Sequence, residues 1–372
     1  MRKIRLIFVI CMFGILGTAC AVIDDITASI DDFTATIDAL TPEGTGTAIG
    51  GGGGGGGAGG GGGGGGTTGG GGGGGLGGLF SSGGNNANVV EPTVPPEGAV
   101  LRPVSTVVRT PATGSNFIEA NGATIDFSNA SSGYIMARRL DATARLVVRI
   151  DKPGVTRPYD FHLNTNGNWE VFPLARGNGT YTISVLEHVD TSRFASLVST
   201  TVNVNMSNSH LPFLYPNQSV NFNSGSAAVR QAAELAQNAV TDIDVVRNVY
   251  HWIITNISYD HSLAASVLDG STMTHIPNVE TTMATRQGIC FDYGALMAAM
   301  LRSQNIPTRL EIGFVMDIYH AWVSVWTPET DWILAAEFSV NGWELMDPTF
   351  TADNNGVSPG IPAASYRVMF MH

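Results

Sequence analysis

The segment Gly288-Ile289-Cys290-Phe291-Asp292-Tyr293-Gly294 determines how this chain is interpreted. Cys290 is the only cysteine after residue 20, since Cys11 and Cys20 belong to the N-terminal segment. The apolar spacing after Cys290 predicts a helix from Cys290 to Ser303. A cysteine at a helix N-terminus lies at the positive end of the helix dipole, which lowers the thiol pKa and favours the reactive thiolate. The segment therefore points to a nucleophilic cysteine.

Two further residues follow in the order that such chemistry needs. His320 stands in Tyr319-His320-Ala321-Trp322, and Asp347 stands in Asp347-Pro348-Thr349. A histidine can take the proton of the thiol, and a carboxylate can fix the tautomer of that histidine. Taken singly, each residue has an ordinary structural explanation: an inert buried cysteine, a core histidine, an acid in a turn. Their order along predicted elements favours a catalytic triad.

Residues 208–372 have the pattern of a mixed α and β region. Helices are predicted at 227–239 and at 242–254, the second with Thr241 as its N-cap, and residues 261–284 are expected to form a long loop. Strands are predicted at 310–316, 320–326, 332–338 and 343–346. The expected fold class is α+β, with the helix that carries Cys290 packed on an antiparallel sheet that carries His320.

The preceding residues divide by composition. Residues 113–207 contain short strands that recur about every ten residues between turn signals, which predicts a small β-sandwich domain. Residues 80–112 are a Pro-containing linker, and residues 50–79 are almost pure glycine, which is typical of a flexible tether. Residues 21–49 include apolar residues at heptad spacing, either a short self-associating helix or a frayed amphipathic spacer.

Residues 1–20 have the pattern of an export signal. Arg2, Lys3 and Arg5 precede an apolar run that is too short for a comfortable transmembrane helix. Leu16-Gly17-Thr18-Ala19-Cys20 resembles a bacterial lipoprotein signal with Cys20 as the lipidated residue, although Gly17 occupies a place that is usually apolar. Ordinary cleavage after Ala19-Cys20-Ala21 is the alternative. Both place the mature protein outside the cytoplasm, anchored at the cell envelope or secreted.

Charge limits the partners of the chain. The formal net charge is −12, which disfavours nucleic acid and anionic membrane surfaces, so membrane attachment is expected only through the N-terminal lipid. Residues 208–372 contain six Arg, no Lys and fifteen Asp or Glu, so their balance is 6 − 15 = −9. That acidity would suit a basic or amine-bearing substrate. The histidines lack ligand spacing for a metal, and no cofactor is predicted.

Four motifs together resemble the transglutaminase-like superfamily, which shares its mechanism with papain-like proteases. They are Gly288-Ile289-Cys290, the helix end from Arg302 to Arg309, His320-Ala321-Trp322-Val323 and Asp347-Pro348-Thr349, and they fall within residues 230–352. The resemblance implies that Cys290 is the nucleophile, His320 the base and Asp347 the residue that orients it. Asn256-Ile257-Ser258-Tyr259-Asp260 also resembles the family and implies an oxyanion role for Tyr259. Asn341 and Gln287 are further candidate oxyanion donors.

The resemblance implies an exported enzyme that attacks peptide or side-chain amides through a thioester. Bacterial relatives of this kind include peptidases and amidases as well as cross-linking enzymes, so hydrolysis is favoured. Protein-glutamine cross-linking is one alternative. A binding or assembly module at the cell surface, which keeps the fold without catalysis, is the other.

Overall fold

The computed structural model describes residues 92–105, 108–190, 193–272, 274–316, 318–328, 331–334, 348–353 and 363–372. They belong to one compact unit. The predicted signal, Cys20, the heptad segment, the glycine tether, Asn341 and Asp347 lie outside these residues. The helices of the described residues include none with the length and apolar character needed to span a membrane.

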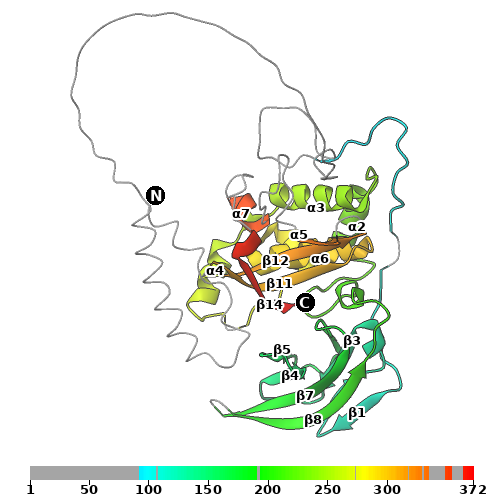
Figure 1. Cartoon of the computed structure of the whole chain (residues 1–372). Coiled ribbons are helices and arrows are strands. Elements are labelled where there is room, and N and C mark those ends of the chain that lie inside the picture. The colour runs from blue at the N-terminus through cyan, green and yellow to red at the C-terminus, as the bar shows by residue number, and fades with distance from the viewer. Residues whose placement is uncertain are drawn as a thin grey trace, which may run out of the picture. The chain divides into compact units, whose positions relative to one another are not determined.

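Residues 117–204 form two antiparallel four-stranded sheets (Figure 1). The first has the order β1-β2-β3-β6 and the second β5-β4-β7-β8, and contacts between β2 and both β7 and β8 join the two sheets. Buried residues alternate with less buried ones in β5 and in the first half of β7, the pattern expected of strands that face a sandwich core on one side. The strands are β1 Phe117–Ala120, β2 Ala123–Asp126, β3 Tyr134–Arg139, β4 Leu146–Asp151, β5 Tyr159–Leu163, β6 Glu170–Pro173, β7 Gly179–Asp190 and β8 Arg193–Val204.

A third antiparallel sheet follows, with the order β13-β12-β11-β14. Its strands are β11 Thr308–Val315, β12 Ile318–Thr327, β13 Asp331–Leu334 and β14 Tyr366–Met371. The strands predicted at 310–316 and 320–326 correspond to β11 and β12. The prediction at 332–338 overlaps β13, and 343–346 lies outside the described residues. β14 was not predicted, and it pairs with β11 at the edge of the sheet.

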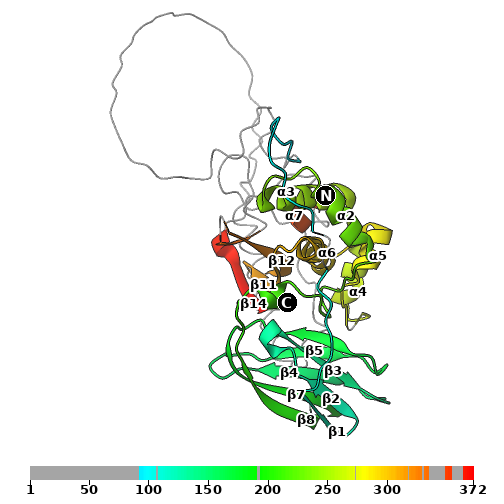
Figure 2. The same cartoon turned by 90° about the vertical axis from the view of Figure 1, so that its right-hand side faces the viewer.

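Helix α6 (Cys290–Ser303) is the centre of the mixed region, and all fourteen of its residues are buried. It contacts β11 and β12, and also the helices α2 Ala227–Leu235, α3 Asp242–Asn256, α5 Val279–Thr285 and α7 Pro348–Asp353. A helix that is buried all round belongs to a core rather than to a surface. Figures 1 and 2 show α6 beside β11 and β12, with α2, α3 and α5 around it. The expected α+β class is confirmed.

The prediction of a loop over residues 261–284 was wrong. That range contains α4 (His261–Leu268) and most of α5. Each helix begins at a polar cap, because the Asp260 side chain accepts from the Leu263 N–H and the Asn278 side chain accepts from the Thr281 N–H. Helix α3 begins at Asp242 with Thr241 as its N-cap, as predicted, and Thr241 and Asp244 form a complete capping box. Helix α2 ends at Leu235, four residues earlier than predicted.

The last strand joins the sandwich to the mixed region. The Met371 N–H donates to the Tyr159 hydroxyl at 3.0 Å, and Arg176 donates to the Met369 carbonyl at 2.8 Å. The buried Arg302 of α6 donates to the carbonyl oxygens of Thr308, Tyr215 and His372. These bonds tie α6, the segment after the sandwich and the end of the chain to one another.

Candidate active site

Cys290 is the first residue of α6 and is only 2% exposed. Gly288 lies in the short strand β10 (Gln287–Gly288), which pairs in parallel with β9 (Ser258–Tyr259). The Asp292 carboxylate accepts from the Ile289 N–H at 2.9 Å. This is the half of a capping box that an acidic third residue supplies, while the Ile289 side chain has no acceptor for the other half. Backbone pairing before Cys290 and the cap after it therefore fix where the thiol stands.

The direction of α6 relative to the sheet follows from contacts at two points. Near its C-terminal end, Arg302 donates bonds of 2.9 and 2.8 Å to the carbonyl of Thr308, the first residue of β11. One turn after Cys290, a Cβ on Gly294 would lie 2.6 Å from Leu310 Cδ1 and 3.7 Å from the Trp322 backbone oxygen. Helix α6 therefore runs from the end of β11 toward its start. Since β11 and β12 are antiparallel, Cys290 lies near the start of β12.

Electrostatics agree with this placement. Tyr319 is the second residue of β12 and directly precedes His320. Burial raises the pKa of the Tyr319 hydroxyl, and the nearby Cys290 raises it further. This interaction between Cys290 and Tyr319 agrees with a thiol that lies near the start of β12. Cys290 at the start of α6 and His320 near the start of β12 therefore lie on two elements that pack against each other. A direct contact between the thiol and the imidazole stays a prediction.

His320 is 4% exposed, and its ring lies nearly parallel to that of Trp322, with centroids 6.3 Å apart and planes 23° apart. The Trp322 indole N–H donates to the Glu311 carboxylate at 2.8 Å, and the Ser324 hydroxyl donates to the same oxygen at 2.7 Å. Burial raises the pKa of the Glu311 carboxyl, and the bond from Ser324 opposes that rise. Glu311 therefore fixes the indole against which His320 rests.

The structure describes two of the other four predicted site residues, Tyr259 and Gln287. Tyr259 pairs with Gly288 across β9 and β10, so its backbone adjoins the segment that leads into Cys290. Gln287 lies in β10 and is exposed. Asp347 and Asn341 are outside the described residues. The chain directly after Asp347 begins α7, which packs against α6 and β9, so the Asp-Pro-Thr motif leads into a helix.

Sequence reasoning missed one residue that contacts the first turn of α6. His275 Nε2 lies 2.9 Å from both carboxylate oxygens of Asp292, which is itself 3% exposed. An ionised carboxylate only accepts, so this nitrogen carries the proton that is shared. His275 therefore offsets the negative charge that stands two residues from the nucleophile. Its position in a loop before α5 gave no signal in the sequence, because the contact is made only in the fold.

No group of three or more His, Cys, Asp or Glu side chains is arranged to hold a metal ion in the ranges that the structure describes. The side chains around α6 instead offer a thiol, an imidazole and hydrogen-bonded carboxylates. Such a set can carry out nucleophilic attack and proton transfer on a carbonyl compound.

Comparison with protein families gives a match to the transglutaminase-like superfamily over residues 229–336. These residues contain Cys290 and His320. A UPF0252 protein of Methanocaldococcus jannaschii is 28% identical over 97 residues, which make up 24% of this chain and 28% of the relative. The chain therefore aligns with little more than a quarter of that relative's length.

Similar solved structures include a candidate cysteine protease of Cytophaga hutchinsonii, at 17% identity and a TM-score of 0.29, over 63% of this chain and 80% of the other. The periplasmic domain of TgpA from Pseudomonas aeruginosa is 16% identical over 74% of this chain and 93% of the other, with a TM-score of 0.29. A red sea bream transglutaminase is 11% identical over 64% and 49%, with a TM-score of 0.19. From the family match, this chain contains a transglutaminase-like domain at residues 229–336.

Proposed function

We propose that this chain is a cysteine-nucleophile enzyme that attacks peptide or side-chain amides and passes through a thioester. The observation that supports this most is the position of Cys290 at the start of the buried helix α6, packed against the strand that carries His320. The helix dipole and an imidazolium both lower the pKa of a thiol, and an attacking thiolate is what the reaction needs.

The proposed reaction has two halves. The Cys290 thiolate attacks the amide carbonyl carbon, and the imidazolium of His320 gives its proton to the leaving nitrogen as the carbon–nitrogen bond breaks. Water then adds to the thioester while His320 takes its proton, and the acid and the thiol are released. Asp347 would accept from the second imidazole nitrogen. The Cys290 N–H and the Tyr259 hydroxyl would donate to the oxyanion, with Gln287 and Asn341 as further candidates.

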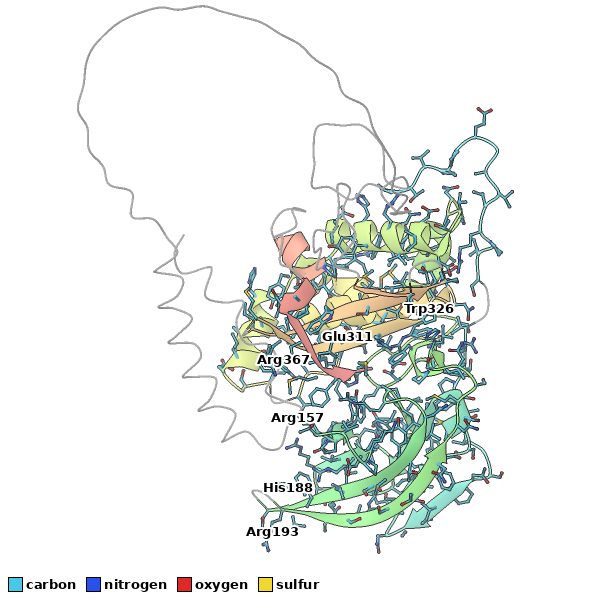
Figure 3. The ribbon with its side chains drawn as sticks, viewed as in Figure 1. Arg157, His188, Arg193, Glu311, Trp326 and Arg367 are labelled. Carbon is cyan, nitrogen blue, oxygen red and sulfur yellow. The ribbon has the colours of Figure 1, made fainter. Side chains whose placement is uncertain are left out.

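Thiol reactivity tests the proposal directly. Iodoacetamide should alkylate Cys290 at neutral pH at least about tenfold faster than a cysteine peptide, and His320→Ala should abolish the excess. Mass spectrometry of the Cys290 peptide separates it from Cys11 and Cys20. His188→Ala is a matched control, since His188 lies on β7 far from α6 (Figure 3). Labelling of Cys290 no faster than the peptide would refute the catalytic proposal.

A second experiment decides which nucleophile resolves the thioester. A glutamine-containing peptide is incubated with and without a primary amine, and the products are weighed. We expect hydrolysis to dominate. Exclusive formation of amine adducts would replace hydrolysis by cross-linking, for which the acidity of residues 208–372 would help to attract an amine-bearing partner.

We also propose that the chain is exported and held at the cell envelope by a lipid on Cys20, on the strength of the signal pattern in residues 1–20. Acyl chains on Cys20 would add a defined mass to the mature N-terminus and be lost in Cys20→Ala. An N-terminus at Val22 with no added mass would favour simple secretion instead.

A further inference from the structure

The surroundings of Tyr319 contain polar groups that the proposed mechanism does not use. The Tyr319 ring packs edge-on against Phe314 of β11, with centroids 5.3 Å apart. The guanidinium carbon of Arg367, on β14, lies 4.6 Å from the centroid of Phe314. Within the part of the chain that the structure describes, neither the Tyr319 hydroxyl nor the exposed Arg367 guanidinium has a hydrogen bond or an ion pair.

A second exposed arginine comes from the β-sandwich. Arg157 stands in the turn between β4 and β5, and in the described residues its guanidinium also lacks a hydrogen bond or an ion pair. The Phe161 ring, on β5, lies 5.3 Å from the His372 ring, which lies 6.4 Å from the ring of Phe291. Tyr159, two residues after Arg157, packs against Phe370 with ring centroids 5.4 Å apart and accepts from the Met371 N–H at 3.0 Å, so the turn before β5 lies beside β14, the strand that carries Arg367. Figure 3 labels Arg157 where the sandwich meets β14.

Electrostatic interactions connect these groups to the thiol. Burial raises the pKa of Tyr319, Cys290 raises it further, and Arg157 lowers it. Both the thiol and the Arg157 guanidinium are therefore within electrostatic reach of the same hydroxyl. Among the described residues, the pairing of β12, β11 and β14 also brings His320, Tyr366 and Arg367 to this end of the sheet. Asp292, paired with His275, stands on the α6 side.

The two arginines at this end of the sheet contrast with the net charge of the whole domain. Residues 208–372 carry a net charge of −9, from six Arg against fifteen Asp or Glu. Charges more than about 10 Å apart are largely screened at physiological salt, so the nearest cations decide what binds beside the thiol. A guanidinium is always protonated, and its fork of N–H donors matches a carboxylate.

We propose that Arg157 and Arg367, together with the Tyr319 hydroxyl, form a subsite for a carboxylate on the substrate, close to the amide that Cys290 attacks. This inference rests on the proposed function. It gives the β-sandwich a part in substrate selection, since Arg157 belongs to that region. It also narrows the expectation drawn from net charge: the acyl donor would be acidic, and an amine-bearing partner would matter only in the cross-linking alternative, where it resolves the thioester.

Iodoacetate and iodoacetamide test the subsite without requiring turnover. They have nearly the same shape and differ in one carboxylate, and each loses iodide as the sulfur–carbon bond forms. The rate of Cys290 alkylation in the full chain is measured by mass spectrometry with each reagent. The ratio of the iodoacetate rate to the iodoacetamide rate should exceed that of a cysteine peptide by about tenfold and fall with added salt.

Variants assign the effect to the arginines. Arg157→Gln and Arg367→Gln should each lower the ratio by about threefold, and the double variant should bring it close to the ratio of the cysteine peptide, while the iodoacetamide rate stays constant. Arg193→Gln is the matched control, because Arg193 is an exposed arginine at the far end of the sandwich, at the tip of the β7–β8 hairpin (Figure 3). It should leave the ratio unchanged.

The outcomes separate this inference from the function on which it rests. A reactive Cys290 whose ratio is unaltered in both arginine variants overturns the subsite and leaves the enzyme proposal standing. A Cys290 that reacts with neither reagent faster than a peptide does overturns both. A lowered ratio in Arg193→Gln as well would show that only the overall charge matters, and would also overturn the subsite.

Discussion

Gly294→Ala is the substitution that tests the placement of α6 most sharply. The added Cβ would stand 2.6 Å from Leu310 Cδ1, whereas ordinary carbon contacts are about 3.5 to 4.0 Å. The methyl group or the helix must therefore move by about 1 Å. Leu310 is fully buried, so it has little space in which to turn. Overpacking of this kind costs about 1–3 kcal/mol, against about 1 kcal/mol gained because alanine is the better helix former. We expect the free energy of unfolding to fall by about 1 kcal/mol.

The effect on reactivity should exceed the effect on stability. A shift of α6 relative to β12 changes the distance between Cys290 and His320, and misplacement by about 1 Å can reduce catalysis about 100-fold. Denaturant unfolding followed by tryptophan fluorescence gives the first quantity, and Cys290 alkylation and peptide cleavage give the second. The double variant with Leu310→Val, which removes Cδ1, should recover part of both. A Gly294→Ala protein that is stabilised by about 1 kcal/mol, with unchanged alkylation, would refute the tight contact.

Three other substitutions have expected outcomes. His275→Asn removes the imidazole donor shared by the two Asp292 oxygens. Cys290 alkylation at neutral pH should slow about fivefold, and the free energy of unfolding should fall by about 1 kcal/mol. Unchanged alkylation would show that His275 has only a structural role. Arg302→Met leaves the carbonyls of Thr308, Tyr215 and His372 without their shared donor. Urea unfolding should show a free energy of unfolding lower by about 3–5 kcal/mol. A loss below about 1 kcal/mol would contradict the idea that Arg302 holds these three segments together. Burial raises the pKa of Glu311 in the folded state above its unfolded value, so the folded protein binds more protons, and its stability falls as pH rises from the ordinary carboxyl pKa through the folded one. Glu311→Gln should therefore reduce the dependence of the free energy of unfolding on pH, measured from about pH 4 to about pH 8. An unchanged pH dependence would mean that other groups cause it.

Local patterns were enough to predict the elements that carry the chemistry. Helix α6 was predicted with its observed bounds, because an apolar run follows a cysteine and ends before Gln304 and Pro307. The strand at 310–316 was predicted from alternation, and the strand with His320 was predicted to follow it. The helices α4 and α5 were missed because Thr, Ser and His are weak helix formers there, yet the caps Asp260 and Asn278 were readable signals.

Features that depend on distant contacts could not be predicted. The strand β14 is held by pairing with β11, more than fifty residues earlier in the chain, and nothing in its own pattern gives that register. His275 and Arg157 are ordinary loop residues in the sequence, and only the fold brings them toward Asp292 and Tyr319. The roles of Cys290, His320 and Asp347 as a triad stay predictions, and Asp347 lies outside the described residues.

The contacts of Arg302 and β14 show that the segment matched by the family is smaller than the part of the chain that must fold together. The family match ends at residue 336, but a fragment ending there would lose β14 and leave the edge of β11 open to pairing with other chains. A fragment beginning at residue 208 would remove Tyr159 and Phe161, which now cover Phe370 and His372. Any rearrangement that carries the proposed activity into another protein must therefore transfer the sandwich and the final strand along with the nucleophile.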